Sequence, residues 1–215
     1  MPKAIAVVAH HDDHILWMGG AIQRLAAAGW QWTLVAMCVP DLTRRQYFLQ
    51  TCLELGASPV TMEFPDYMGG PPFSRNEQKL MRQTLADAVR GQTFELVFTH
   101  SRGPNGEYWA RHANHEEVRM VTAELVESKR LGDGRGRLAH FAYDVIYGGG
   151  TATCAMLNSD YRLPLTYPEL LAKCRLSGLA PDADTSLRNL CYPCPNPEAF
   201  EGDDLELPNL FVRRR

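Results

Sequence analysis

The stretch AIAVVAHHDDHILWMGGAIQRLAAAGW, residues 4–30, indicates how the fold begins. Its first part, residues 4–10, is a short run of small and β-branched apolar side chains, which is typical of a buried parallel strand. Its second part, residues 15–30, has apolar side chains at helical spacing, and Gly29 is placed to end the helix. Five consecutive ionisable residues separate the two apolar parts. Folding such a block next to a core requires charge pairing, a bound metal or water.

The alternation of strand and helix patterns continues along the chain. The expected segments are, in order, a strand at 32–39, a helix at 42–56, a strand at 59–64, a helix at 76–91, a strand at 95–100, a helix at 113–130 and a strand at 140–148. This rhythm indicates βαβ units with right-handed crossovers. The predicted fold class is therefore α/β and Rossmann-like, with a mostly parallel sheet and helices on both faces.

The C-terminal third has a different character, because it holds most of the prolines and little periodicity. We expect one domain over residues 1–215, in which residues 1–149 form the sheet core. Residues 150–215 are expected to form an irregular, Pro-rich cap over the sheet, with one helix at 167–176. The length of the chain is sufficient for a single domain with a sizeable core.

Composition limits the classes of partner. The chain has 45% hydrophobic and 22% charged residues and a net charge of -3, so it lacks the basic character of a nucleic-acid-binding protein. No run reaches the roughly 18 apolar residues of a membrane span, and no secretory signal pattern opens the sequence. A cytoplasmic location is expected. The near-neutral charge balance permits self-association into a homo-oligomer, and the oligomeric state stays open.

Two local patterns are interpreted as structural. The pair Cys191 and Cys194 lacks the second cysteine pair of a zinc ribbon, so we expect reduced thiols in a loop. Gly19 and Gly20 lie inside the first expected helix, where each glycine costs about 1 kcal/mol relative to alanine. Close approach of this helix to the sheet is the expected reason for the glycine pair.

Histidines are concentrated at two places in the sequence. Six of the seven fall in two clusters, His10, His11 and His14 in the first and His100, His112 and His115 in the second. Each cluster follows an expected strand, and the carboxyl ends of parallel strands line one edge of a sheet, where ligands bind. The two clusters are therefore expected to meet, although they are about 100 residues apart in the sequence.

A catalytic metal site accounts for this pattern. Two histidines and one carboxylate are a common catalytic zinc set that leaves the fourth position to water, and His10, Asp13 and His115 are the candidates. A dication would also compensate the adjacent carboxylates Asp12 and Asp13. Zinc is the expected metal, and another divalent metal is left open. Three further histidines are interpreted as hydrogen-bonded neighbours of the site or as surface residues: His11, His100 and His140.

Two blocks of the chain resemble a known family. Residues 9–14 read AHHDDH, and residues 99–115 read THSRGPNGEYWARHANH. They are similar to the A-H-P-D-D-E and TH…G…H-P-D-H blocks of the PIG-L/LmbE-like zinc-dependent N-deacetylases, the N-acetylglucosaminyl deacetylase type. The resemblance extends over about residues 4–120. The other shared features are the glycine pair Gly19 and Gly20, the R…LG helix at 44–56 and the Pro-Asp pair Pro65 and Asp66.

The resemblance implies a role for each matching residue. The implied roles are zinc ligands for His10, Asp13 and His115, general base for Asp12, oxyanion stabiliser or proton donor for His112, and substrate contacts for Arg44 and Asp66. The chain departs from the family pattern at several positions, without loss of an implied ligand or base. The departures are His11 for Pro, His14 for Glu, Tyr47 for Glu, and Ala113 with Asn114 for Pro-Asp. They favour a substrate that differs from the family's usual one.

The expected function is that of a zinc-dependent amide hydrolase, a metal-dependent N-deacetylase. Its partner is expected to be a small N-acylated molecule, an amino sugar or sugar conjugate that loses an acetyl group. Two alternatives stay open: a hydrolase of another amide, such as a thiol conjugate or natural-product intermediate, and a catalytically silent metal- or sugar-binding module. A nucleotide-binding domain is disfavoured, because HHDDH occupies the place of the G-x-G-x-x-G turn.

Overall fold

The computed structural model describes residues 1–67, 73–101, 113–131, 136–141, 143–148, 151–156, 161–178, 198–201 and 212–213. His112, Cys191 and Cys194 lie outside these residues, so the predictions for them stay predictions. Within the described residues, no helix is long and apolar enough to cross a membrane.

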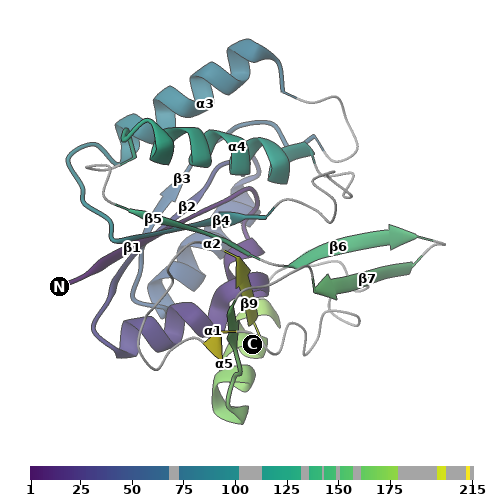
Figure 1. Cartoon of the computed structure of the whole chain (residues 1–215). Helices are drawn as coiled ribbons and strands as arrows, with labels where there is room; N and C mark the ends of the chain where they lie inside the picture. The colour runs from purple at the N-terminus through teal and green to yellow at the C-terminus, as the bar shows by residue number, and fades with distance from the viewer. Residues whose placement is uncertain are drawn as a thin grey trace.

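A parallel sheet forms the centre of the molecule (Figure 1). Its strands run in the order β3-β2-β1-β4-β5, and each neighbouring pair is parallel. The bounds are β1 (Lys3–Val8), β2 (Gln31–Ala36), β3 (Ser58–Thr61), β4 (Leu96–His100) and β5 (Arg137–Phe141). The predicted α/β class with a mostly parallel sheet is therefore confirmed.

Helices cover both faces of this sheet. Figure 1 shows α3 and α4 on one face and α1 and α2 on the other. The bounds are α1 (Asp13–Ala27), α2 (Leu42–Glu54), α3 (Arg75–Ala88) and α4 (Ala113–Glu127). Alternate residues of β1 point to opposite faces, as strand geometry requires. Ala6 and Val8 lie in the core with α1 and α2, whereas Ile5 and Val7 lie in the core with α3 and α4.

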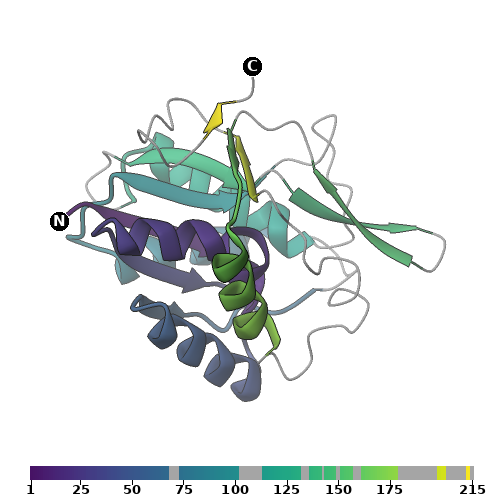
Figure 2. The ribbon, with the colours of Figure 1, turned by 90° about the horizontal axis from the view of Figure 1, so that it is seen from below.

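The C-terminal third extends the sheet. Three short antiparallel strands continue it beyond β5 in the order β9, β8, β10. Helix α5 confirms the predicted helix and lies beside α1 (Figure 2). The bounds are β8 (Tyr161–Leu163), α5 (Tyr167–Gly178), β9 (Glu198–Glu201) and β10 (Val212–Arg213). These strands have two to four residues, too few for a recognisable alternation of polar and apolar side chains.

The strand predicted at 140–148 is two strands. β5 ends at Phe141, and β6 (Tyr143–Gly148) leaves the central sheet to form a separate antiparallel hairpin with β7 (Thr151–Met156). Figure 1 shows this hairpin projecting from the body of the molecule. A continuous run of strand-forming residues does not reveal the point where the chain changes sheets, so the sequence analysis merged the two strands.

The glycine pair of α1 does allow a close approach, but its closest neighbours belong to the C-terminal third. An ideal Cβ on Gly20 would lie 2.2 Å from Leu165 Cδ2, and one on Gly19 would lie 3.2 Å from Lys173 Cγ. The prediction that the glycine pair packs against the sheet is therefore wrong, because its nearest neighbours are Leu165 and Lys173. The segment from β8 to α5 supplies these contacts, and it is more than 140 residues away in the sequence.

Candidate metal centre

The three predicted metal ligands come together at the carboxyl edge of the parallel sheet. His10 follows β1, Asp13 is the first residue of α1, and His115 lies in the first turn of α4. Strands β1 and β4 are neighbours, although two other strands lie between them in the sequence. Such a topological switch point opens a crevice at the strand ends, and the fold thereby joins the two histidine clusters.

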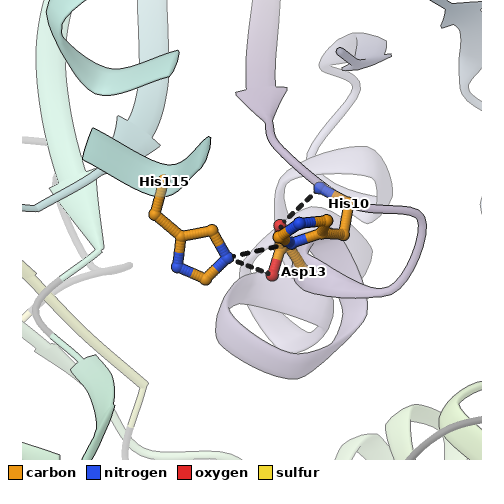
Figure 3. A group of neighbouring side chains, drawn as sticks. All are labelled: His10, Asp13 and His115. Atoms are coloured by element: carbon orange, nitrogen blue, oxygen red, sulfur yellow. Dashed lines mark hydrogen bonds and ion pairs between the residues drawn. The ribbon is translucent and has the colours of Figure 1, made fainter. Parts of the chain in front are cut away.

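The facing atoms of the three side chains are close (Figure 3). His10 Nδ1 lies 3.0 Å from His115 Nε2 and 3.4 Å from Asp13 Oδ2, and His115 Nε2 lies 3.4 Å from Asp13 Oδ1. One ligand atom from each residue lies within 4.8 Å of the others. Each residue is at most 8% exposed.

This set of atoms fits a zinc ion. Two imidazole nitrogens and a carboxylate oxygen are ordinary zinc ligands, and three protein ligands leave a position for water or substrate. Buried ligand atoms that converge in this way are unusual without a compensating positive charge, because burial of a carboxylate or an imidazole lone pair is costly unless the group is paired or bound to a metal. The convergence of His10, Asp13 and His115 is thus the structural basis for a metal at this place.

Asp13 is held in one orientation by two donors. The backbone N–H of His10 donates to Asp13 Oδ2 at 2.7 Å, and Trp17 Nε1–H donates to Asp13 Oδ1 at 3.2 Å. Burial alone would raise the pKa of Asp13. The neighbouring His115 and His100 outweigh burial and hold this pKa well below its usual value. Asp13 therefore presents an ionised carboxylate.

The two candidate histidine ligands have opposite protonation tendencies. Burial lowers the pKa of His10, but hydrogen bonds to Asp13 and Asp66 outweigh burial and raise it to about 10. Burial, followed by the nearby His100, lowers the pKa of His115. These shifts favour a protonated His10 and a neutral His115 in the metal-free site. Metal binding requires the release of that proton, because only the neutral imidazole is a ligand.

His100 supports the site from the end of β4, as expected for a hydrogen-bonded neighbour. Its ring stacks on His115 with centroids 4.1 Å apart and an interplanar angle of 9°. Its Nε2 accepts the backbone N–H of Ala9 at 2.9 Å. His140 Nδ1 lies 2.8 Å from the His100 carbonyl oxygen, so His140 is also a hydrogen-bonded neighbour.

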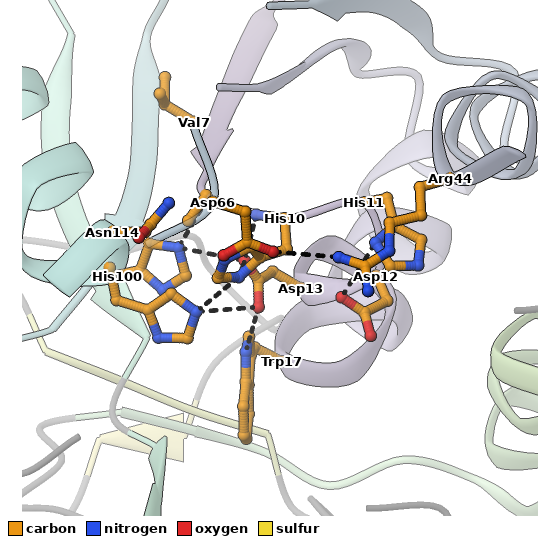
Figure 4. Close-up of polar contacts among 12 residues, drawn as sticks. Val7, His10, His11, Asp12, Asp13, Trp17, Arg44, Asp66, His100 and Asn114 are labelled. Atoms are coloured by element: carbon orange, nitrogen blue, oxygen red, sulfur yellow. Dashed lines mark hydrogen bonds and ion pairs between the residues drawn. The ribbon is translucent and has the colours of Figure 1, made fainter. Parts of the chain in front are cut away.

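Asp66, which follows β3, and Arg44, which lies in α2, extend the site on one side (Figure 4). Asp66 Oδ1 lies 3.2 Å from His10 Nε2, and its Oδ2 accepts from Arg44 Nη1 at 3.0 Å. A carboxylate on the far nitrogen of a metal-binding histidine fixes the ring and its tautomer. Sequence reasoning assigned Asp66 a substrate contact and missed this contact with His10, which joins residues 56 positions apart.

Asp12, the candidate general base, lies at the turn before α1. It takes the N-cap position but makes no side-chain capping bond to the helix. Its Oδ1 is 3.8 Å from His11 Nδ1, and Figure 4 shows Asp12 beside His11 near the candidate ligands. Its carboxylate is therefore not committed to holding the helix.

Departures from the family pattern lie together at the contact between α1 and α2. The His11 ring packs edge-on against Tyr47, with centroids 5.4 Å apart. His14 is fully buried, and its Nε2 lies 3.0 Å from Thr51 Oγ1. Its ring also packs edge-on against Phe48. His11 and Tyr47 therefore contact each other, and His14 packs against the same helix, α2, while the ligand set is kept.

Asn114 is another departure with a structural role that the sequence did not reveal. Its Oδ1 accepts the backbone N–H of Tyr67 at 3.0 Å, and its Nδ2 donates to the Pro65 carbonyl at 2.9 Å. These two bonds hold the segment that carries Asp66. Asn114 thus connects the start of α4 to the residue that orients His10.

Comparison with known proteins gives a match to one family model and similarity to several solved structures. The chain matches the model of the PIG-L family, GlcNAc-PI de-N-acetylase, over residues 5–126. It resembles the 4-carboxy-2-hydroxymuconate hydratase GalB from Pseudomonas putida KT2440, with 17% identity, 100% of this chain and 98% of that chain covered, and a TM-score of 0.60. No curated protein matches the chain.

Deacetylases are also among the similar structures. The N,N'-diacetylchitobiose deacetylase from Pyrococcus horikoshii is 14% identical, with 93% of this chain and 82% of that chain covered and a TM-score of 0.58. The zinc-inhibited form of teicoplanin deacetylase Orf2 is 12% identical, with coverage of 99% and 98% and a TM-score of 0.60. At these identities the likeness shows the fold.

The family match covers more than half of the chain and includes every candidate ligand. It confirms the predicted family and the predicted enzyme class, a metal-dependent N-deacetylase. The chain therefore belongs to the PIG-L family of GlcNAc-PI de-N-acetylases.

Proposed function

We propose that the protein is a zinc-dependent amide hydrolase that removes an N-acetyl group from an amino sugar or sugar conjugate. The observation that carries this proposal is the convergence of His10, Asp13 and His115 at the switch point of the sheet, in a member of a de-N-acetylase family. The cytoplasmic location and the oligomeric state stay predictions.

The proposed chemistry needs a bound metal and a prepared set of ligands. A zinc ion held by His10, Asp13 and His115 would polarise the acyl carbonyl and acidify a water molecule. Asp66 orients the His10 ring through Nε2, and Trp17 with the His10 backbone orients the Asp13 carboxylate. These contacts fix the ligands before substrate arrives.

Asp12 is proposed as the general base. Its carboxylate takes a proton from the attacking water and returns it to the leaving amine, a role that typically contributes about 10²–10⁴-fold to the rate. Its position next to Asp13 and its freedom from helix capping support this role. His112, which lies outside the described residues, is proposed to stabilise negative charge on the acyl oxygen.

Arg44 and Asp66 are proposed to contact the substrate. The Arg44 side chain is 35% exposed, and its guanidinium pairs with Asp66 at 3.0 Å, so it borders the site. Two structural neighbours are named as deacetylases, one of N,N'-diacetylchitobiose and one of teicoplanin. They support a small acylated molecule as the substrate.

One observation favours a second reaction. One of the structural neighbours that match this chain almost end to end is a hydratase of 4-carboxy-2-hydroxymuconate. Addition of water to the double bond of an unsaturated carboxylic acid is therefore the second candidate, and it would use the same water-activating residues. The de-N-acetylase family match favours amide hydrolysis as the first candidate.

A substrate panel with and without metal tests the proposal. The zinc-loaded protein is incubated with N-acetylated mono- and disaccharides, acylated thiol conjugates and unsaturated dicarboxylates, and acetate, free amine and loss of the double-bond absorbance are measured. The expected result is equimolar acetate and amine, abolished by chelation and restored by zinc. Hydration without acetate release would instead support the second candidate. Stoichiometric zinc without turnover of any substrate would identify a silent binding module.

A further inference from the structure

Helix α1 is broken immediately after its first turn. Met18 has φ -145° and ψ 19°, which lies outside the helical region. A break of this kind divides α1 into a first turn, residues 13–17, and a second segment, residues 19–27. The first backbone N–H groups of the second segment then lack partners within the helix and need acceptors from elsewhere.

Glu198 of β9 supplies these acceptors. Its Oε1 accepts the N–H of Gly20 at 2.8 Å, and its Oε2 accepts the N–H of Ala21 at 2.7 Å. The side chain is fully buried. A carboxylate at the amino end of a helix is also favoured by the helix dipole. Glu198 therefore caps the second segment of α1 from 177 to 178 residues away in the sequence.

Lys173 of α5 balances the buried carboxylate. Its Nζ donates to Glu198 Oε1 at 2.7 Å, and the residue is only 4% exposed. Leu165 packs on Gly20 and the Lys173 stem packs on Gly19, so the glycine pair leaves the space that this ion pair needs. The break, the glycines and the ion pair thus form one arrangement.

The arrangement lies next to the candidate metal centre. The first turn of α1 carries Asp13, and Trp17 at its end donates to the Asp13 carboxylate. Because Met18 interrupts the helix, the direction of the first turn is set at the break and not by a continuous helix axis. Whatever holds the break therefore aims the Asp13 carboxylate.

We propose that Glu198 is a positioning residue for the metal centre, because its cap on α1 fixes the break that aims Asp13 toward His10 and His115. The inference rests on the proposed function of that site. Glu198 and Lys173 both lie outside the stretch that matches the family model, residues 5–126. The site of this chain is therefore completed by its C-terminal third.

The test compares two carboxylates of the C-terminal third that both contact α1, Glu198 through backbone N–H groups and Glu169 through Arg24. Glu198→Gln leaves a single acceptor oxygen for two N–H groups. The matched control is Glu169→Gln, which removes the ion pair between Glu169 and Arg24. Arg24 Nε donates to Glu169 Oε1 at 2.8 Å, and Arg24 lies in the last part of α1, beyond the break. Zinc affinity is measured by competition with a chromophoric chelator, and unfolding of the metal-free proteins is measured in parallel.

We expect Glu198→Gln to weaken zinc binding about 10- to 100-fold, as for loss of a residue that orients a metal ligand. The control is expected to keep its affinity within about twofold, even where its unfolding midpoint falls, because it leaves the break intact. If Glu198→Gln does not fold, the variant Glu198→Gln/Lys173→Met gives the same comparison without an uncompensated buried charge.

The outcomes separate this inference from the proposed function. If wild type and Glu198→Gln bind zinc with equal affinity, the positioning role is overturned and the hydrolase proposal still stands. Equal weakening in Glu169→Gln also overturns it, because general loosening of α1 would then explain the loss. A wild-type protein that binds no zinc at this site contradicts the proposed function itself.

Discussion

The two parts of the chain contribute different things to the candidate site. The segment from β1 to β5 supplies all three candidate ligands and the parallel sheet that brings them together. The described part of the C-terminal third supplies none of these ligands, but Glu198 and Lys173 hold the helix on which Asp13 lies. The comparison teaches that the ligands come from one region, whereas some of the groups that position them come from another.

The difference between the two parts also appears in their strands. The five parallel strands and their helices form a conventional switch-point crevice, and the family match covers most of this part, residues 5–126. The antiparallel strands β8, β9 and β10 lie outside the match and extend one edge. Variants on each side should therefore fail in different ways: loss of chemistry in the first part, and loss of packing or alignment in the second.

The largest expected effect belongs to the first part. Asp12→Asn should lower kcat by about 10²–10⁴-fold while zinc stays bound, because the amide cannot accept the proton from water. Turnover and zinc content are measured on the same sample. Asp87→Asn, on the exposed surface of α3, is the matched control and should behave as wild type. Wild-type turnover in Asp12→Asn would contradict the general-base role.

A smaller effect is expected where the two parts touch. Gly20→Ala places a Cβ 2.2 Å from Leu165 Cδ2, so we expect a loss of about 1–3 kcal/mol in the free energy of unfolding from overpacking. The closest neighbour of a Cβ in Gly19→Ala is the flexible Lys173 stem at 3.2 Å, so this variant should cost less. Urea unfolding of both variants checks the order. A gain in stability for Gly20→Ala, as helix propensity alone predicts, would show that the contact with Leu165 is unimportant.

The third effect is confined to acidic pH and concerns packing within the first part. Burial lowers the pKa of His14 from 6.5 to about 3, so the folded protein keeps this ring neutral. Between pH 6.5 and 3 the unfolded chain binds the extra proton. The stability that His14 contributes is therefore complete above pH 6.5 and falls with decreasing pH, by up to about 1.4 kcal/mol per pH unit.

His14→Gln tests this dependence, because glutamine can keep a hydrogen bond to Thr51 without titrating. The unfolding free energy of the metal-free variant should fall less steeply between pH 6.5 and 4 than that of wild type. Equal slopes for the two proteins would mean that His14 is not kept neutral by the fold.

Sequence patterns predicted the part of the fold with long periodic elements. The parallel strands alternate regularly with helices α1 to α4 along the chain, whereas β8, β9 and β10 are two to four residues long and follow no such alternation. The three candidate ligands were found because each follows or begins an element at the same sheet edge. The contacts of Asp66 with His10 and of Glu198 with α1 were missed, because no local spacing encodes a contact across 56 or 178 residues.

The central claim is that two distant histidine motifs hold one metal ion, and elemental analysis tests it most directly. The protein is purified without a histidine tag, supplied with zinc and dialysed, beside His115→Ala and the control His140→Gln. We predict about one zinc per chain in wild type and control, and loss of zinc in His115→Ala. Equal zinc in His115→Ala and wild type, or no zinc in wild type, would contradict the account.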